Sequence, residues 1–318
     1  MKKTILITGG TGYLGRNLAT MLKSKYEVIL GARNNKQNLQ ANKQTGCETV
    51  PLDVTNIDSI RDIINEYKPN IIIHAAATKF VDLSQKFPFE CLDVNVQGSS
   101  NIARVAIDKN VESVIGISTD KASPPIENIY GMSKSMMERL FCSCNKKSKT
   151  KFVCVRYGNV VWSTGSVLPL WKSMHDKDKI IYTTGPEMKR YFFTVHDACQ
   201  LVLNAIKNVS KFQGKVLSRE MKSCKMIDII KIWIKEYGGE YKIVNQREGD
   251  ALVEYLIGES ERYYTKEIKI DNTKHYLIDF KNKLKKPLSK TLSSDNARKL
   301  TAADIKDFIK IGIDKELG

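Results

Sequence analysis

Short apolar runs and longer amphipathic stretches alternate along the first half of the chain. Apolar runs that are typical of buried strands occupy residues 3–8, 26–30, 48–52, 70–74, 113–117 and 151–156. Between most of these runs, apolar positions recur at helical spacing, and we expect helices at residues 12–23, 57–67, 89–109 and 130–145. Strands that alternate with helices predict βαβ units, and therefore an α/β fold built on a parallel sheet.

The pattern is looser beyond about residue 160. Residues 166–174, 195–208 and 226–237 have helical spacing, and short strands are expected between them. The lysine-rich residues 281–290 predict an exposed connection to a last helix at residues 302–310. We therefore expect a main domain at residues 1–160 and a smaller C-terminal α/β lobe at residues 161–318 that is interleaved with the sheet.

A glycine-rich segment, Gly9-Gly10-Thr11-Gly12-Tyr13-Leu14-Gly15, follows the first expected strand and opens the first expected helix. In this context Gly9 allows a tight turn, Gly12 lets the backbone approach a pyrophosphate, and Gly15 allows close packing of helix and strand. The helix N-terminus favours the anion. The segment, including Thr11, Tyr13 and Leu14, predicts a Rossmann-type doubly wound sheet that binds a dinucleotide.

The end of the second expected strand indicates which dinucleotide is bound. NAD sites usually place an acidic residue here for the ribose hydroxyls, whereas this chain has Arg33, with Lys36 close by. A guanidinium can pair with a 2′-phosphate, so the sequence favours NADP over NAD. Asp53 and Val54 follow the third strand, where we expect a contact with the adenine.

Two acid/base pairs follow the fifth expected strand. Tyr130 and Lys134 are spaced to share one face of a helix. A phenol with a pKa near 10 is a poor base at neutral pH, and a nearby ammonium favours its phenolate and can hold the ribose of the cofactor. Thr119 can hydrogen-bond the same substrate hydroxyl. Asp120 and Lys121 add a second acid and a second base, and the alternative interpretation of this pair is a surface salt bridge.

These residues form part of a series of motifs that resembles the extended short-chain dehydrogenase/reductase family. Within that family, the series is most similar to the UDP-N-acetylglucosamine 4,6-dehydratases that invert C5. It covers almost the whole chain and comprises His74-Ala75-Ala76-Ala77-Thr78-Lys79, Pro88-Phe89-Glu90-Cys91, Asn95, Ser118-Thr119-Asp120-Lys121-Ala122, Asn128-Ile129-Tyr130-Gly131-Met132-Ser133-Lys134, Arg156-Tyr157-Gly158-Asn159-Val160-Val161, Glu187-Met188-Lys189-Arg190-Tyr191-Phe192 and Leu292-Ser293-Ser294-Asp295.

The resemblance implies a redox-neutral dehydration. Tyr130 takes the proton of the C4 hydroxyl while NADP accepts the C4 hydride, and the resulting ketone acidifies the C5 proton, which Lys121 removes. A protonated Asp120 donates to the departing C6 hydroxyl, the hydride returns to C6, and reprotonation on the opposite face inverts C5. The roles of Asp120 and Lys121 can also be exchanged or shared, because a close pair titrates as a unit. A lysine base needs a lowered pKa, which a closed, partly dry site can supply.

The resemblance also assigns the remaining parts of the chain. The main domain binds NADP, with Ala75 and Ala76 at the cofactor, and the second lobe mainly binds the UDP-sugar. The substrate contacts that it implies are Lys79, Asn159, Arg190, Arg247 and Glu254. Asn95 is implied as a helix-kinking residue that supports the catalytic lysine. The helices at residues 89–109 and 130–145 resemble those that pair in a homodimer or larger oligomer, although ordinary core packing also explains their apolar stripes.

Three departures from the family pattern concern the sugar pocket. Trp162 stands where a small residue is expected, Thr164 stands where a basic residue is expected, and residues 247–254 match a Gly-Glu-Lys pattern only in part. The two replaced side chains can reshape the pocket. These departures affect the predicted identity of the sugar more than they affect the hydride-transfer interpretation.

The composition limits the other classes of function. The net charge of +16 invites a nucleic-acid interpretation, but the lysines are spread along the chain and no basic stripe contains interleaved aromatics. Part of the charge suits an acidic substrate. No apolar run approaches the roughly 18 residues of a membrane span, and seven scattered cysteines without metal-ligand spacing indicate reduced thiols in a cytoplasmic protein without a metal site.

Three other functions remain as alternatives. The first two are a 4,6-dehydratase that retains C5 and a simple 4-epimerase; the retaining relatives generally have Met in place of Tyr130, and the epimerases lack the Asp120–Lys121 pair. The third is an NADP-bound or nucleic-acid-binding protein that is not an enzyme.

Overall fold

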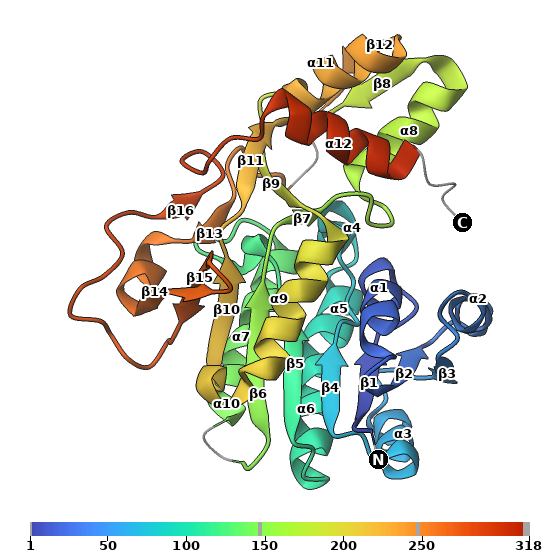
Figure 1. Ribbon diagram of the computed structural model, residues 1–318, viewed down its shortest axis with the longest axis vertical. Helices are drawn as coiled ribbons and strands as arrows, with labels where there is room; N and C mark the ends of the chain where they lie inside the picture. The colour runs from blue at the N-terminus through green and yellow to red at the C-terminus, as the bar shows by residue number, and fades with distance from the viewer. Residues whose placement is uncertain (1, 146–147, 246–248, 314–318) are drawn as a thin grey trace.

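The computed structural model of the chain describes residues 2–145, 148–245 and 249–313. Within these residues, a nine-stranded sheet has the order β14-β15-β10-β6-β5-β4-β1-β2-β3 (Figure 1). The strands from β3 across to β10 pair in parallel, whereas β15 and β14 are added antiparallel at one edge. Their bounds are β1 (Thr4–Thr8), β2 (Glu27–Ala32), β3 (Glu48–Pro51), β4 (Ile71–His74), β5 (Ser113–Ile117), β6 (Lys151–Arg156), β10 (Lys215–Arg219), β14 (Thr265–Ile270) and β15 (Thr273–Ile278).

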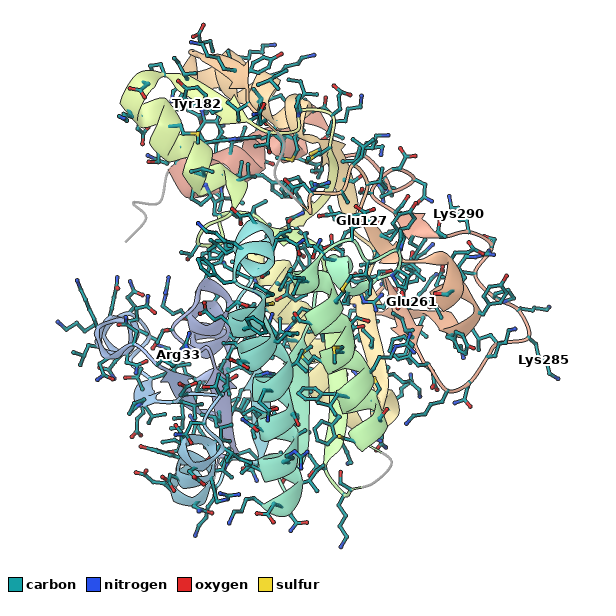
Figure 2. The ribbon with its side chains drawn as sticks, turned by 180° about the vertical axis from the view of Figure 1, so that it is seen from behind. Arg33, Glu127, Tyr182, Glu261, Lys285 and Lys290 are labelled. Atoms are coloured by element: carbon teal, nitrogen blue, oxygen red, sulfur yellow. The ribbon has the colours of Figure 1, made fainter. Side chains whose placement is uncertain are left out.

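Helices cover both faces of this sheet, as the alternating pattern predicts. Helices α1 and α9 pack together on one face, and α6 and α7 pack on the other, where α3 lies against α6 (Figures 1 and 2). The bounds are α1 (Tyr13–Leu22), α3 (Ile57–Tyr67), α6 (Gly98–Asp108), α7 (Ile129–Cys144), α9 (Val195–Lys207) and the short α10 (Val209–Phe212). The prediction of a doubly wound Rossmann-type sheet is confirmed.

Two segments differ from the expected elements. Helix α2 (Asn35–Thr45) is not expected from periodicity because few of its residues are apolar, yet the Asn34 side chain accepts a hydrogen bond from the Gln37 backbone N–H at its start and Gly46 ends it at φ 68°. The single helix expected at residues 89–109 is divided into α5 (Pro88–Leu92), a π-helical turn η1 (Asp93–Gln97) and α6. The widened turn carries the buried Asn95.

A second hydrophobic core lies beyond the carboxyl ends of the parallel strands (Figure 1). It is built mainly from α8 (Val167–Asp178), α11 (Met226–Tyr237) and α12 (Ala302–Ile313), which confirm three of the expected helices. Short strands complete this lobe: β7 (Asn159–Val160), β9 (Lys189–Phe193) and β11 (Lys222–Lys225) form one sheet, and β8 (Ile180–Thr183) pairs with β12 (Glu240–Ile243). Residues 281–290 are mostly exposed, as predicted, and Lys285 and Lys290 lie at the surface in Figure 2.

Trp162 joins this second core to the loop that follows β7. Its backbone has φ 60°, in the left-handed region, and its side chain is 2% exposed. The indole Nε1 donates a hydrogen bond to the Phe308 carbonyl of α12 at 2.5 Å. A Cβ added at Gly312 would lie 1.9 Å from the indole, so helix and ring are in direct contact. Trp162 therefore packs into the second core and is not part of the cavity lining, although its neighbours Val161 and Ser163 are.

Candidate active site

A cavity of about 680 Å³ lies at the carboxyl ends of the parallel strands and extends into the second lobe. Figure 2 shows two of its lining residues far apart, with Arg33 in the loop after β2 and Tyr182 in the second lobe. Most of the residues singled out in the sequence line this cavity: Gly9, Thr11, Gly12, Tyr13, Leu14, Gly15, Arg33, Val54, Ala75, Ala76, Lys79, Thr119, Lys121, Tyr130, Lys134, Asn159, Arg190 and Glu254. The fold therefore brings the glycine loop, the two acid/base pairs and the basic residues into one space.

The glycine loop packs closely against neighbouring backbone and lines the cavity. Gly9 has φ 66°, and a Cβ there would lie 2.8 Å from the backbone of Ala76, while a Cβ at Gly15 would lie 2.4 Å from the carbonyl oxygen of Gly10. Gly12 precedes the first residue of α1, and the first turn of α1 contains no acidic residue, so its backbone N–H groups face the cavity side of the loop without a competing carboxylate. These residues fit the diphosphate of a dinucleotide.

The loop after β2 is the other candidate contact for the cofactor. Arg33 is exposed and lines the cavity together with Asn34 and Gln37. Among the described residues, Lys36 and Asp53 are not part of the cavity lining. Lys36 is exposed on α2, and the Asp53 carboxylate accepts hydrogen bonds from the Thr55 N–H at 2.9 Å and hydroxyl at 2.8 Å. The carboxylate of Asp53 is therefore engaged in a local turn.

Tyr130 and Lys134 face the cavity from the first turns of α7. Burial, together with the negative charge of Asp120, raises the pKa of Tyr130 to about 12 against the opposing effects of Lys121 and a hydrogen bond with Thr119. Burial also lowers the pKa of Lys134 to about 8, and its ammonium lies 3.3 Å from the Met137 sulfur. The phenolate expected from the Tyr130–Lys134 spacing is therefore not the stable form of the protein alone, because desolvation outweighs the opposing charge of Lys121 and the hydrogen bond with Thr119.

Asp120 and Lys121 form a buried network with a third residue, Glu254. The short turn η2 (Asp120–Ala122) carries the pair, and Thr119, which precedes it, donates its hydroxyl to Asp120 Oδ1 at 3.1 Å. Lys121 Nζ lies 3.3 Å from Asp120 Oδ1 and 2.6 Å from Glu254 Oε1. The Asp120 carboxyl is 1% exposed and lies behind Gly158, which lines the cavity without a side chain. The alternative interpretation of this pair as a surface salt bridge is wrong.

The protonation of this network differs from the expectation for Lys121. Burial and the adjacent negative charge of Glu254 raise the pKa of Asp120 to about 7, with Lys121 opposing them. Two neighbouring carboxylates raise the pKa of Lys121 above its usual value, although its burial opposes them. The predicted lowering of the Lys121 pKa by a dry site is therefore wrong for the protein without substrate, because the dry site also contains its counter-ions.

The remaining expected substrate contacts surround Glu254. Arg190 Nε lies 3.3 Å from Glu254 Oε1, and Asn159 Nδ2 donates to Glu254 Oε2 at 3.3 Å. Lys79 lies across the cavity mouth, where its ammonium donates to the Thr164 carbonyl at 2.5 Å. Burial lowers the Lys79 pKa. Arg247 lies outside the described residues.

Two buried polar clusters hold helix α7, which carries Tyr130 and Lys134. The Asn95 amide donates to Ser133 Oγ at 2.9 Å and to the Thr78 carbonyl at 3.0 Å, which ties the π-turn to the residue next to Lys134. On the other side, the Arg156 guanidinium pairs with Glu138 of α7 and with Glu261 of η3 (Glu259–Tyr264), both at 2.6 Å. The role of Asn95 as a support near the lysine, implied by the resemblance, is consistent with these contacts.

Some lining residues could not be identified from the sequence. The second-lobe end of the cavity is lined by Tyr182, Thr183 and Met226. The sequence around these residues predicts strands and helices but contains no recognisable binding motif. The contact of Glu254 with Lys121 was also missed, because the two residues are far apart in the chain and only the fold brings them together. The partial match of residues 247–254 to the family pattern was the available signal.

Comparisons with known proteins agree with this geometry. The model of the family described as polysaccharide biosynthesis protein matches residues 5–275. The chain is 35% identical over 314 residues to an uncharacterized membrane protein, MJ1061, of Methanocaldococcus jannaschii, with 91% of this chain and 93% of that protein covered. It is 29% identical over 274 residues to a UDP-N-acetylglucosamine 4,6-dehydratase (inverting) of Campylobacter jejuni, covering 84% of this chain and 80% of that protein.

Longer relatives also match. The capsular polysaccharide biosynthesis protein CapD of Staphylococcus aureus is 36% identical over 277 residues, which cover 81% of this chain but 46% of CapD. The chain thus spans about half the length of that relative. In the described part of this chain, every helix is too short or too polar to cross a membrane.

Solved structures show the same architecture. Pen from Bacillus thuringiensis superposes with a TM-score of 0.89 at 26% identity and 97% coverage of both chains. A UDP-glucose 4-epimerase of Thermus thermophilus, solved with NAD, has a TM-score of 0.68 at 19% identity and covers 78% of this chain and 88% of its own. Together with the motifs, these matches show that the chain belongs to the polysaccharide biosynthesis protein family, within the extended short-chain dehydrogenases/reductases.

Proposed function

We propose that the protein is a UDP-N-acetylglucosamine 4,6-dehydratase that inverts C5. The observation that carries this proposal is the position of the Asp120–Lys121 pair beside the cavity that Tyr130 and Lys134 line. A tyrosine–lysine pair is enough for alcohol oxidation, whereas elimination of water also needs an acid for the leaving hydroxyl and a base for the C5 proton. The similarity to the inverting dehydratase of C. jejuni supports the same activity.

Each group of this site has a proposed role. Tyr130 binds the C4 hydroxyl and removes its proton, with Thr119 as its hydrogen-bond partner. Asp120 supplies a proton to the C6 hydroxyl as it leaves, which its raised pKa supports. Lys121 removes the C5 proton, which requires that its own proton first leave. Asn159, Arg190 and Lys79 bind the sugar diphosphate from the cavity wall, where Arg190 can pair with phosphate oxygens.

We infer that the cofactor is NADP. The glycine loop holds its diphosphate, Arg33 pairs with its 2′-phosphate, and Lys134 contacts its ribose. When bound, the nicotinamide accepts the hydride from C4 and returns it to C6. A positive charge beside Tyr130 would lower the pKa of the phenol toward the working range, because a neighbouring cation favours the phenolate.

Product analysis tests the reaction directly. The protein is incubated with NADP and UDP-N-acetylglucosamine in deuterated water, and the sugar is followed by NMR. We expect loss of the C6 hydroxyl and deuterium at an inverted C5. An unchanged sugar, or a C4 epimer alone, would refute the proposal, and deuterium at a retained C5 would assign the retaining reaction. Tyr130→Phe serves as the inactive control.

We also propose that the protein forms a homodimer through α4 (Val81–Lys86), α5 and α7. These neighbouring helices expose an unusual number of large apolar side chains: Phe80, Leu83, Phe87, Phe89, Leu92, Met132 and Met136. Phe89 is 79% exposed. Light scattering should show that Phe89→Asp yields monomers, whereas Leu39→Asp, at an exposed apolar position on α2, leaves the dimer intact. Monomers of the unchanged protein would refute this interface.

A further inference from the structure

Glu254 contacts three polar side chains that line the cavity, those of Lys121, Arg190 and Asn159. Its carboxylate is 2.6 Å from Lys121 Nζ, 3.3 Å from Arg190 Nε and 3.3 Å from Asn159 Nδ2. The residue is 4% exposed. Both oxygens of the Glu254 carboxylate have protein donors. Glu254 therefore affects the position and charge of Lys121, Arg190 and Asn159, and is not only a contact to the sugar.

The backbone of Glu254 is fixed by a buried serine. Ser294, in the Leu292-Ser293-Ser294-Asp295 motif, accepts a hydrogen bond from the Glu254 N–H at 3.0 Å, and its own N–H donates to the Glu254 carbonyl at 2.7 Å. The Ser294 hydroxyl in turn donates to the Lys189 carbonyl next to Arg190 at 2.8 Å. Ser294 is fully buried. The Ser294 contacts therefore fix the position of the Glu254 carboxylate relative to Lys121 and Arg190.

The network contains more carboxylates than Lys121 can neutralise alone. Lys121 lies close to Glu254 and farther from Asp120, and Arg190 adds its charge on the side of Glu254. The charges of these two cations lower the pKa of Glu254 to about 2 against its burial. Within the described residues, Asp120 Oδ2 has no hydrogen-bond partner, so a charge on this buried oxygen would be poorly stabilised.

We propose that Glu254 is a positioning residue that keeps Asp120 protonated as the acid of elimination and holds Lys121 Nζ in place for the C5 proton. This inference deepens the proposed dehydratase function and rests on it for the chemical step. The other titratable groups facing Asp120 are the phenols of Tyr130 and Tyr191, whose pKa values are both raised by burial, so they are neutral. The contacts of Glu254 therefore determine that the proton is on Asp120 and not on Glu254.

The elimination step is balanced with these groups. Lys121 enters the step in its neutral form, after its own proton has been released to solvent. The C5–H bond breaks as its proton goes to Lys121, and the Glu254 carboxylate at 2.6 Å stabilises the ammonium that forms. The electron pair of that bond forms the C5=C6 double bond, and the C6–O bond breaks with its pair on oxygen. The departing hydroxyl takes the proton of Asp120 and leaves as water. The summed charge of Asp120, Lys121 and Glu254 is the same before and after the step.

The protonation of Asp120 can be measured without any sugar. Infrared difference spectroscopy of the full chain follows the protonated-carboxyl band as pH is varied, and loss of that band in Asp120→Asn assigns it. In the unchanged protein we expect titration near pH 7. Glu254→Gln should move the midpoint down by about one unit or more, because Asp120 then becomes the only carboxylate paired with Lys121. Lys121→Met should move it up, because the cation opposite Asp120 is lost. If Glu254→Gln does not fold, Glu254→Asp decides the matter: its shorter side chain withdraws the carboxylate, and the midpoint should move down by a smaller amount.

Controls separate this role from general damage. Asp295→Asn removes an exposed carboxylate that pairs with Lys189 nearby and should leave the band and its midpoint unchanged. With sugar, Glu254→Gln should lower the elimination rate about 100-fold while C4 oxidation persists, and Glu254→Asp should recover part of the loss. The inference is overturned if the band is absent in the unchanged protein, or if its midpoint is the same in Glu254→Gln. Failure of the sugar to react would count against the dehydratase proposal and leave the infrared result decisive for Glu254.

Discussion

Replacement of Arg33 by alanine is the sharpest test of the cofactor assignment. Arg33 lines the cavity directly after β2, where Asn34 begins the cap of α2, and no acidic side chain occupies this turn. If Arg33 pairs with a 2′-phosphate, its removal should weaken binding of NADP and leave binding of NAD unchanged. The difference between the two cofactors therefore isolates this one contact.

The exposure of Arg33 sets the size of the effect. A hydrogen-bonded pair with a charged group contributes roughly 1.5–3 kcal/mol when it is shielded from water. Solvent and salt weaken an exposed pair, so we expect about 1–2 kcal/mol here. That loss corresponds to an increase in Kd of roughly 5- to 30-fold for NADP. Raising the salt concentration should reduce the difference between the unchanged protein and the variant, because screening weakens the same pair.

Titration calorimetry with NADP and with NAD measures both affinities. Lys36→Ala is the matched control, since Lys36 has the same charge and lies three residues along the chain but is exposed on α2 outside the cavity lining. It should change the Kd for NADP less than twofold, as expected for a distant exposed charge. An equal loss for NADP and NAD in Arg33→Ala, or a loss in Lys36→Ala of the same size, would refute the assignment.

Three further predictions concern the buried charges. Lys121→Ala should slow elimination by about 100-fold or more while C4 oxidation remains visible as a rise in reduced-nucleotide absorbance, and normal dehydration by this variant would exclude Lys121 as the base. Lys134→Met should stabilise the protein without cofactor by about 3 kcal/mol below pH 8, because the folded state there must bury an ammonium whose pKa is lowered to about 8. That gain should fade as the pH rises toward 10.5, and denaturant unfolding at several pH values that showed a constant gain would contradict it. Arg156→Met should destabilise by about 3–5 kcal/mol, because it leaves Glu138 and Glu261 buried without their cation, whereas adding Glu138→Gln and Glu261→Gln should restore much of the loss in thermal unfolding.

The glycine loop and the two acid/base pairs could be predicted because local sequence carries their geometry. A strand followed by closely spaced glycines and a helix has few alternative structures, and the spacing of Tyr130 and Lys134 needs only one helix. Helix α2 was missed because it is polar and is specified by its ends, Asn34 and Gly46, rather than by an apolar face.

The protonation states could not be predicted in the same way. They depend on burial and on charges that arrive from distant segments, and both are properties of the folded chain. Burial keeps the Tyr130 phenol protonated, and the spacing of Tyr130 and Lys134 does not reveal how dry the site is. Likewise, Lys121 looked like a candidate for a lowered pKa until the fold placed Glu254 against it.

The contact between Trp162 and helix α12 has a consequence for how this protein can change over evolution and in the laboratory. Because a side chain at position 312 would occupy the space of the indole, Trp162 and Gly312 are expected to be exchanged together, with a smaller residue at 162 permitting a larger one at 312. The residues on either side of Trp162, Val161 and Ser163, line the cavity. Substitutions in this loop that change the sugar specificity should therefore be accompanied by compensating substitutions in α12. A chimaera of two relatives should take the loop and α12 from the same parent.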